Sequence, residues 1–412
     1  MLGVMCGLAA GAWLGAAEAP AKLVTIGLSP FLISLAMVTG VFVARWTLPT
    51  LMKGTGYIFL DLREKPHLIV WAVLAGAIWA VANTLTVFAI RDVGISIAFP
   101  LWNTNSLVGV FWGWFFFREL RGADWSGWAK VVGGALAIVT GATLLGYASS
   151  HGGTSISAHA TTGIPAALGA GLLWGTMYIP YRKAYLSGMN PLSFVTVFTV
   201  GELVTVSTLA LVFRGGFAPL LEEVGRARPA LFWLFLGGFC WVLGDLFQQY
   251  AAKYIGIGRG IPLSNTNQLW GLAWGALVFG ELAGSSSKGL VFGGSLLMIA
   301  GALGISTSVA GSRERSSQQE AMERECQRYG LRIEELTAAL AGEDPLAEKV
   351  GARRAWDVPI LLGAVGIFVW LAIGTERPPI AMNLAWVAAL LVPSLLLLGA
   401  CGWLLWKRTK FS

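Results

Sequence analysis

Two apolar stretches of this sequence place tryptophan and hydrogen-bonding side chains on one face of a predicted helix. In the first stretch, Trp79, Asn83 and Thr86 are spaced i, i+4 and i+7, which puts them on the same side of an α-helix. The second stretch repeats this spacing and holds Trp241, Asp245, Gln248 and the adjoining Gln249. The chain has 19 tryptophans, so the paired pattern is informative where a single tryptophan is not.

Indole rings beside amides and a carboxylate are suited to binding a sugar. A pyranose has an apolar face of C–H bonds that packs on indole, and its hydroxyls need the donors and acceptors that such polar side chains supply. The competing interpretation is that the polar groups hold helices together and the tryptophans lie at membrane interfaces. We expect substrate contacts from Trp79, Asn83, Trp241, Asp245, Gln248 and Gln249.

Two carboxyl groups lie inside apolar stretches. Asp245 lies in the middle of one, and Glu202 lies well inside another. An ionisable group within a membrane is costly and indicates a function. We therefore expect Asp245 or Glu202 to couple transport to protons, and the alternative is a hydrogen-bonded carboxyl with a packing role. Asn83, which matches Asp245 in the first stretch, is neutral, so only one copy of the pattern carries the charge.

The sequence Asn-Thr-Asn occurs twice, each time shortly after a proline. In a continuous helix Asn103 and Asn105 point about 200° apart, so they cannot face one cavity. Because the preceding proline loosens the helical hydrogen bonds, Asn103 and Asn265 are the expected substrate-binding residues. Asn105 and Asn267 share a face with glycines and are expected to hold helices together.

Four further polar residues are given minor roles. Glu119 and Glu281 end their apolar stretches, and we interpret them as markers of the membrane boundary. Glu18 and Tyr178 lie near glycines and prolines that could act as hinges, and both are minor candidates for the cavity.

The elements that must position these residues are membrane helices. Of the 412 residues, 56% are hydrophobic and 12% are charged, and a soluble domain carries about 25% charged residues. Apolar runs of about 20 residues, enough to cross a hydrocarbon core of about 30 Å, recur along the chain. They predict spans at 2–20, 28–47, 68–90, 94–117, 129–148, 163–181, 192–213, 230–252, 256–280 and 288–309, and then at 357–375 and 382–406.

Basic residues are distributed unevenly between the predicted loops. With a cytoplasmic N-terminus, most of the 29 Lys and Arg residues, Arg45 among them, fall on the cytoplasmic side. The positive-inside rule therefore predicts a multi-pass protein of the cytoplasmic (inner) membrane with both termini in the cytoplasm. This orientation explains the net charge of +7 better than nucleic-acid binding does. The four scattered cysteines have no metal-binding spacing, and the N-terminus lacks the basic region of a cleaved signal peptide.

The two halves of the main body repeat each other. At an offset of 162, Trp79 aligns with Trp241 and Asn103 with Asn265. Each repeat holds five predicted spans, an odd number, so the second copy is inverted in the membrane. Inverted repeats are typical of secondary transporters, which hold substrate near the midplane between the halves.

The predicted fold is an all-α polytopic membrane protein with two inverted five-helix repeats, ten transmembrane helices in all. The predicted segments are a first five-helix repeat at 1–148, a second, inverted repeat at 163–309, a charged cytoplasmic helical linker at 311–354 and an additional C-terminal two-helix transmembrane hairpin at 357–406.

One stretch resembles a known family. GAIWAVANTLTVFAIRDVGISIAFPLWNTNSLVG, with Trp79, Asn83 and Pro100, is similar to the glucose/ribose porter family of sugar uptake proteins within the drug/metabolite transporter superfamily. GGFCWVLGDLFQQYAAKYIGIGRGIPLSNTNQLWG is its second-half version, with Asp245 where the first half has asparagine. The resemblance covers residues 1–309. It implies ten helices in two inverted halves, cytoplasmic termini and monosaccharide uptake driven by protons.

These observations predict a secondary active transporter that moves a small neutral sugar by alternating access, with a proton as coupling ion. The alternatives are export of another small metabolite or drug-like solute on the same scaffold, and a membrane sugar sensor that signals through residues 311–412. The sequence has no phosphate-binding Gly-Lys-Ser/Thr loop and no Ser/His/Asp set within its spans, so we predict neither a pump driven by ATP nor an enzyme. We expect no cofactor, metal or nucleic acid. The expected partners are the sugar, the lipid bilayer and a second copy of the chain.

Overall fold

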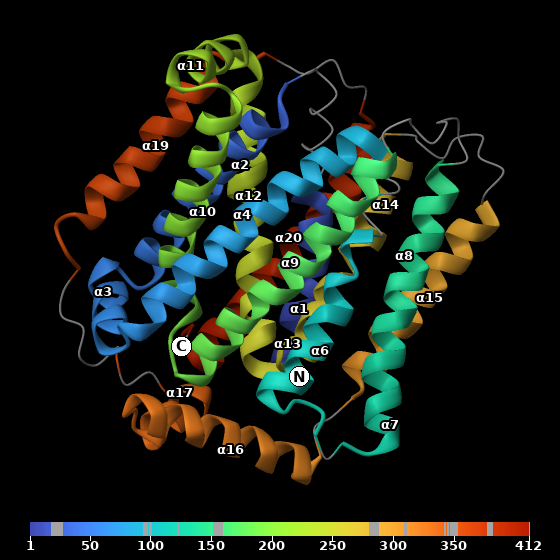
Figure 1. Ribbon diagram of the computed structural model, residues 1–412, viewed down its shortest axis with the longest axis vertical. Coiled ribbons are helices and arrows are strands. Elements are labelled where there is room, and N and C mark those ends of the chain that lie inside the picture. The colour runs from blue at the N-terminus through green and yellow to red at the C-terminus, as the bar shows by residue number, and fades with distance from the viewer. Residues whose placement is uncertain are drawn as a thin grey trace.

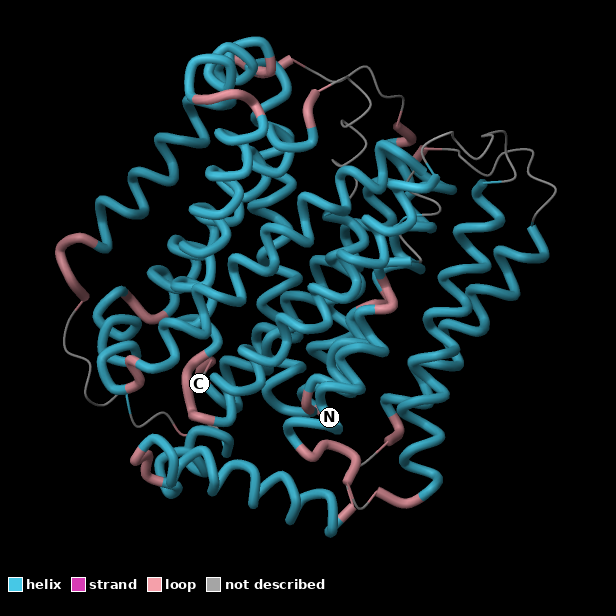
Figure 2. Tube along the Cα trace, in the orientation of Figure 1, coloured by secondary structure: helices cyan, strands magenta, loops and turns pink. Residues whose placement is uncertain are grey.

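The structure is a computed structural model in which every described element is helical (Figures 1 and 2). It describes the chain except for residues 18–27, 94–97, 99–100, 122, 151–159, 280–287, 309–310, 342, 344–345, 347–352, 377–381 and 412. Seven helical segments are long and apolar enough to cross a membrane: Pro30–Met52, His67–Val93, Trp125–Leu144, Pro191–Phe213, Arg228–Ile255, Gly289–Ser306 and Leu384–Thr409. Three shorter apolar helices accompany them, at Leu2–Ala17, Asn105–Phe117 and Asp357–Ile373.

The helices of the first half are α1 (Leu2–Ala17), α2 (Pro30–Met52), α3 (Thr55–Glu64), α4 (His67–Val93), α6 (Asn105–Phe117), α7 (Trp125–Trp128), η2 (Ala129–Gly133) and α8 (Gly134–Ser150). Those of the second half are α9 (Ala160–Leu186), α10 (Pro191–Phe213), α11 (Phe217–Arg226), α12 (Arg228–Ile255), α13 (Ile257–Ser264), α14 (Asn267–Ala273), η3 (Trp274–Val278) and α15 (Lys288–Ser306).

Corresponding helices of the two halves begin with the same local chemistry. The hydroxyl of Ser29 accepts a hydrogen bond from Leu32 N at the start of α2, and the side chain of Asn190 accepts one from Leu192 N at the start of α10. A proline occupies the first turn in both, where its missing N–H would have no helical partner anyway. Polar N-caps and proline therefore set the start of both helices.

Contacts between the halves occur in matching pairs. Helix α4 packs against α9 and α10, while α12 packs against α1 and α2. The same correspondence relates the contact of α6 with α9 to that of α14 with α1. Glycine makes the closest approaches possible, because a Cβ at Gly40 would overlap the carbonyl oxygen of Phe235 and a Cβ at Gly201 would overlap that of Val73. The two halves therefore interlock closely in these places.

Two predicted spans are not continuous helices. The span expected at 94–117 has turns at Asn103 and Thr104, and α6 begins only at Asn105. The span expected at 256–280 consists of α13, α14 and η3, with a break at 265–266. Both breaks fall within the Asn-Thr-Asn sequences.

The segment that follows the second half covers one end of the bundle. Helix α16 (Ser312–Tyr329) lies across the ends of α4, α6 and α9 (Figure 1). Glu325 pairs with Lys183 at 3.0 Å, Glu320 pairs with Arg118 at 2.8 Å, and the ring of Tyr329 stacks on His67 with centroids 3.8 Å apart. We call this the α16 end of the bundle, and the opposite end, which carries α11, the α11 end.

The remaining helices pack on separate parts of the bundle. Helix α17 (Ile333–Ala341) follows α16, and its Leu336 lies in the main apolar cluster. Helix α19 (Asp357–Ile373) packs against α2 and α12, whereas α20 (Leu384–Thr409) packs against α1. The two helices of the predicted C-terminal hairpin thus pack against different helices of the bundle.

Gly201→Ala should loosen the contact between α10 and α4. The new Cβ overlaps the Val73 carbonyl oxygen, and overpacking of this kind costs about 1–3 kcal/mol. Gly293→Ala is the matched control, because a Cβ there meets no described atom within 4 Å. Thermal unfolding in detergent should show a lower midpoint for the first variant only. Equal midpoints would contradict the close approach of α4 and α10.

Candidate functional site

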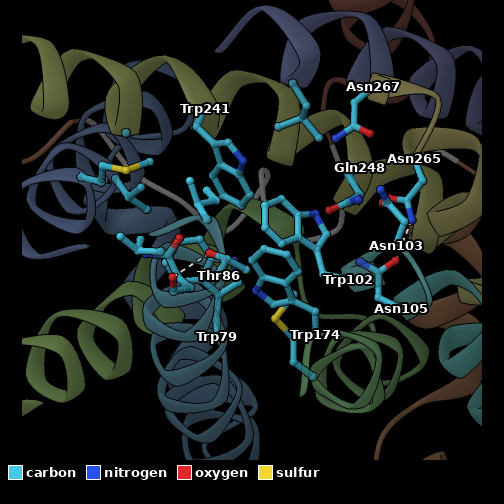
Figure 3. A pocket seen from close by; sticks show the side chains of 18 of the residues that line it. Trp79, Thr86, Trp102, Asn103, Asn105, Trp174, Trp241, Gln248, Asn265 and Asn267 are labelled. Atoms are coloured by element: carbon cyan, nitrogen blue, oxygen red, sulfur yellow. Dashed lines mark hydrogen bonds between the residues drawn. The ribbon is translucent and has the colours of Figure 1, made fainter. Parts of the chain in front are cut away.

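A cavity of about 120 Å³ lies between helices of both halves (Figure 3). It lies along the parts of α2 and α4 that are nearer the α11 end, with Ile33, Met37, Val41 and Ile90 in its wall. Six of the predicted substrate-binding residues line it: Trp79, Asn83, Asn103, Trp241, Gln248 and Asn265. The other predicted site residues, Asp245, Gln249 and Glu202, are buried outside the lining.

Indole rings form much of the cavity wall. Trp79 of α4 and Trp241 of α12 meet with ring centroids 5.3 Å apart and planes at 59°. A second pair, Trp102 and Trp174, meets edge to face at 6.0 Å. The sequence analysis missed this second pair, because neither residue belongs to the repeated Trp-x-x-x-Asn pattern. Figure 3 shows the four rings gathered around one space.

One of these four rings carries a hydrogen-bond donor that has no acceptor among the described residues. This donor is the indole Nε1 of Trp174, which is buried. A buried N–H is normally paired, so a donor in a cavity wall is a group that a bound hydroxyl can satisfy.

Amides occupy the other side of the cavity, and their arrangement corrects one prediction. Asn103 and Asn105 line the same cavity, although a continuous helix would separate them, because the turns at 103–104 reorient the chain. Asn265 donates from Nδ2 to the side-chain oxygens of Asn105 and Ser106, both at 2.6 Å. Asn105 therefore joins the halves and lines the cavity at once. Asn267 and Tyr178 also line it.

Arg45 is the main functional residue that the sequence analysis misplaced. It was counted with the loop residues, whereas the structure places it inside α2 with a fully buried side chain. Its guanidinium contacts Glu202 of α10 at 2.8 Å and Asp245 of α12 at 2.5 Å. We call Arg45, Glu202 and Asp245 the charged triad. The signal in the sequence was an arginine seven residues before the end of an apolar helix, in a chain whose other apolar stretches hold two carboxyl groups that need a counter-charge.

Neighbouring side chains contact Asp245 and Arg45 of the charged triad. Gln249 donates to the second oxygen of Asp245 at 2.8 Å, and the Tyr185 hydroxyl donates to Gln249 at 2.5 Å. The guanidinium of Arg45 lies 4.4 Å from the ring centroid of Phe198, a favourable cation–π distance. Buried charges need such paired and polarisable surroundings.

The charged triad lies next to the cavity. On α2 it is nearer the α16 end than the cavity residues are, whereas on α12 the cavity residue Gln248 lies beyond Asp245. Asp245 follows the cavity residue Trp241 by four residues, and Arg45 follows Val41 by four, which is about 6 Å along each helix. The Arg45 guanidinium also lies 5.7 Å from the centroid of the Trp241 ring. Trp241 thus touches both the cavity and the charged triad.

Glu119 is more than a boundary marker. Its side chain is buried, pairs with Arg182 of α9 at 2.8 Å and accepts hydrogen bonds from Ile257 N and Gly258 N. A carboxylate is stabilised at the N-terminus of a helix, here that of α13, so Glu119 joins three segments at the α16 end. The matching Glu281, and the minor candidate Glu18, lie outside the described residues.

Removal of Arg45 alone should be more destabilising than removal of the whole charged triad. Arg45→Met leaves two buried carboxylates without a cation, and breaking a buried ion pair in this way costs about 3–5 kcal/mol. Adding Glu202→Gln and Asp245→Asn removes both charges and should recover most of the loss. Unfolding midpoints of the single and triple variants measure the difference. A single variant as stable as the unmodified protein would show that Arg45 is not the buried counter-ion.

Comparisons with known proteins identify a matching family and several similar proteins. Residues 161–307 match the EamA-like transporter family. A protein of Lactobacillus johnsonii named for sugar uptake is 37% identical over 93 residues, which are 21% of this chain and 32% of that protein. A Listeria monocytogenes protein named for sugar uptake is 24% identical over 248 residues, 60% of this chain and 81% of its own. A glucose uptake protein of Staphylococcus aureus is 21% identical over 270 residues, 62% of this chain and 85% of its own.

These matches confirm the resemblance to sugar uptake proteins of the drug/metabolite transporter superfamily, and the chain spans about a third of the length of the first relative. They also confirm that the chain is a multi-pass membrane protein. The family to which residues 161–307 are similar is one of transporters.

Proposed function

We propose that this protein is a secondary active carrier of a small neutral sugar. The observation that carries the proposal is the cavity, which is lined by four indole rings and by amide groups. Stacking surfaces together with convergent polar groups match the two faces of a pyranose. The names of the relatives point to the same class of substrate.

Alternating access follows from the repeated construction. The contacts of α4 with α9 and α10 mirror those of α12 with α1 and α2, as expected if two inverted five-helix repeats enclose one site. Such a bundle can exchange the roles of its halves by rocking around the cavity. The positive-inside rule makes the α16 end cytoplasmic, because α16 and the basic residues Arg118, Arg182 and Lys183 gather there.

The charged triad is suited to carrying the coupling proton. Two carboxylates share one guanidinium, so the three residues of the charged triad together carry one net negative charge. One proton on Asp245 or Glu202 removes that charge, and a buried site favours neutrality. Trp241 connects this event to the cavity, because it lines the cavity and lies 5.7 Å from the Arg45 guanidinium.

Trp79→Ala should weaken sugar binding. Loss of one stacking ring should lower affinity about tenfold, since an aromatic contact contributes roughly 0.5–1.5 kcal/mol beyond its buried area. Trp79→Phe keeps a stacking ring and should retain most of the affinity. The matched control is Trp125→Ala, whose side chain is 85% exposed and far from the cavity lining. Equilibrium binding of labelled sugar measures the effect, and equal losses at Trp79 and Trp125 would contradict the proposed site.

Uptake by liposomes tests the whole function. Reconstituted protein should accumulate labelled glucose, ribose or rhamnose when protons flow inward, and should only equilibrate it without a gradient. Asp245→Asn should abolish accumulation but keep sugar exchange, because Arg45 retains Glu202 as its partner. Glu223→Gln, a carboxylate change at the α11 end, is the control and should accumulate normally. Folded protein that neither takes up nor exchanges any of these sugars would refute the proposal.

A further inference from the structure

The charged triad joins the two halves of the chain. Arg45 belongs to α2, whereas Glu202 and Asp245 belong to α10 and α12. Their side chains are at most 1% exposed, and the guanidinium reaches both carboxylates at once. Any motion that separates α2 from α10 and α12 at this level must break one of the two ion pairs.

The space between the cavity and the α16 end is filled around the charged triad. Tyr181 and Tyr185 of α9 and Phe194 and Phe198 of α10 are all buried there and pack edge to face or tilted against one another. A substrate leaving the cavity toward the α16 end must therefore pass this layer. The Arg45 guanidinium lies 4.4 Å from the ring centroid of Phe198 in this layer, so the aromatic layer and the charged triad are in contact.

The equivalent positions in the other repeat carry no ion pair. An offset of 161, which aligns Pro30 with Pro191, places Val206 opposite Arg45 and Val41 opposite Glu202. An offset of 162 places Asn83 opposite Asp245. These three residues are also buried, and Asn83 donates a hydrogen bond to Ser34 at 3.2 Å. The charged triad thus has a neutral counterpart.

We propose that Arg45 is the gating residue of this carrier and that the gate it forms exists at one end only. Arg45 is a positioning residue, which holds α2 against α10 and α12 and leaves one carboxylate each time the α16 end opens. The corresponding positions of the other repeat hold Val41, Val206 and Asn83, which form no such ion pair. The carrier therefore rests with its α16 end closed. This inference assumes that sugar leaves the protein toward the cytoplasm at the α16 end, and it therefore rests on the proposed carrier function.

Hydrogen exchange in lipid nanodiscs tests the gate without any substrate. The test protein is the full chain with Arg45→Met, Glu202→Gln and Asp245→Asn, which removes the ion pairs without leaving a buried unpaired charge. The readout compares backbone amides on the α16 side of α2, α10 and α12 with amides on the α11 side of the same helices. Local opening exposes amides to exchange, so the rate reports how often each side parts.

The expected result is selective acceleration. Amides on the α16 side should exchange about 5–150-fold faster, the range typical of one coupling interaction, while those on the α11 side keep their rates. On the α16 side, the exchange rates of Arg45→Lys should lie between those of the unmodified protein and those of the triple variant. An ammonium cannot bind two carboxylates in the fixed geometry of a guanidinium. The control, Arg214→Met with Glu223→Gln, removes an ion pair of the α11 end (2.6 Å) and should leave the α16 side unchanged.

Two results would overturn the gate: unchanged exchange on the α16 side, or an equal increase on both sides, which marks general loosening. If the triple variant cannot be purified, Arg45→Lys decides alone by the same comparison. Failure of sugar transport is a separate outcome. If exchange were faster on the α16 side alone but the protein moved no sugar, the gate would stand and only the proposed sugar substrate would be refuted.

Discussion

Burial of the Arg45 guanidinium is the constraint on which the arrangement of the bundle depends. A cation in an apolar bundle needs counter-charge in direct contact, and here the carboxylates come from two other helices, α10 and α12. Once these helices are fixed around Arg45, Trp241 meets Trp79 and Gln249 is held by Asp245. The position of Arg45 thus determines both the cavity wall and the ion pairs beside it.

Close backbone packing supplies the second requirement. Gly40 lets α2 approach α12 and Gly201 lets α10 approach α4, because neither residue has a side chain in the contact. Lipid tails are as apolar as the helix surfaces, so hydrophobicity alone would not bring the helices so close. Between α2 and α12, glycine and charge act together, because Gly40 permits the close approach and Arg45 pairs with Asp245 across it.

Much of the site could be predicted from spacing, because residues four or seven apart on a helix share a face whatever the tertiary structure. Trp79 with Asn83 and Trp241 with Gln248 reach one cavity for that reason. Arg45 was missed because a charge near the end of an apolar run looks like a loop residue until its partners, far apart in sequence, are placed in space. The shared cavity of Asn103 and Asn105 was missed because a helix break depends on packing that no local pattern shows.

The contacts of α16 differ from the charged triad in one physical respect. Glu325 with Lys183 and Glu320 with Arg118 are at least partly exposed, so dissolved ions screen them, whereas the buried pairs of Arg45 are shielded from salt. Two layers of charge at one end of the protein therefore respond to different surroundings. The ion pairs of the outer layer weaken as the ionic strength of the solution rises, which lets the helices beneath them move more freely. The ion pairs of the inner layer change only when a proton or a substrate enters the bundle.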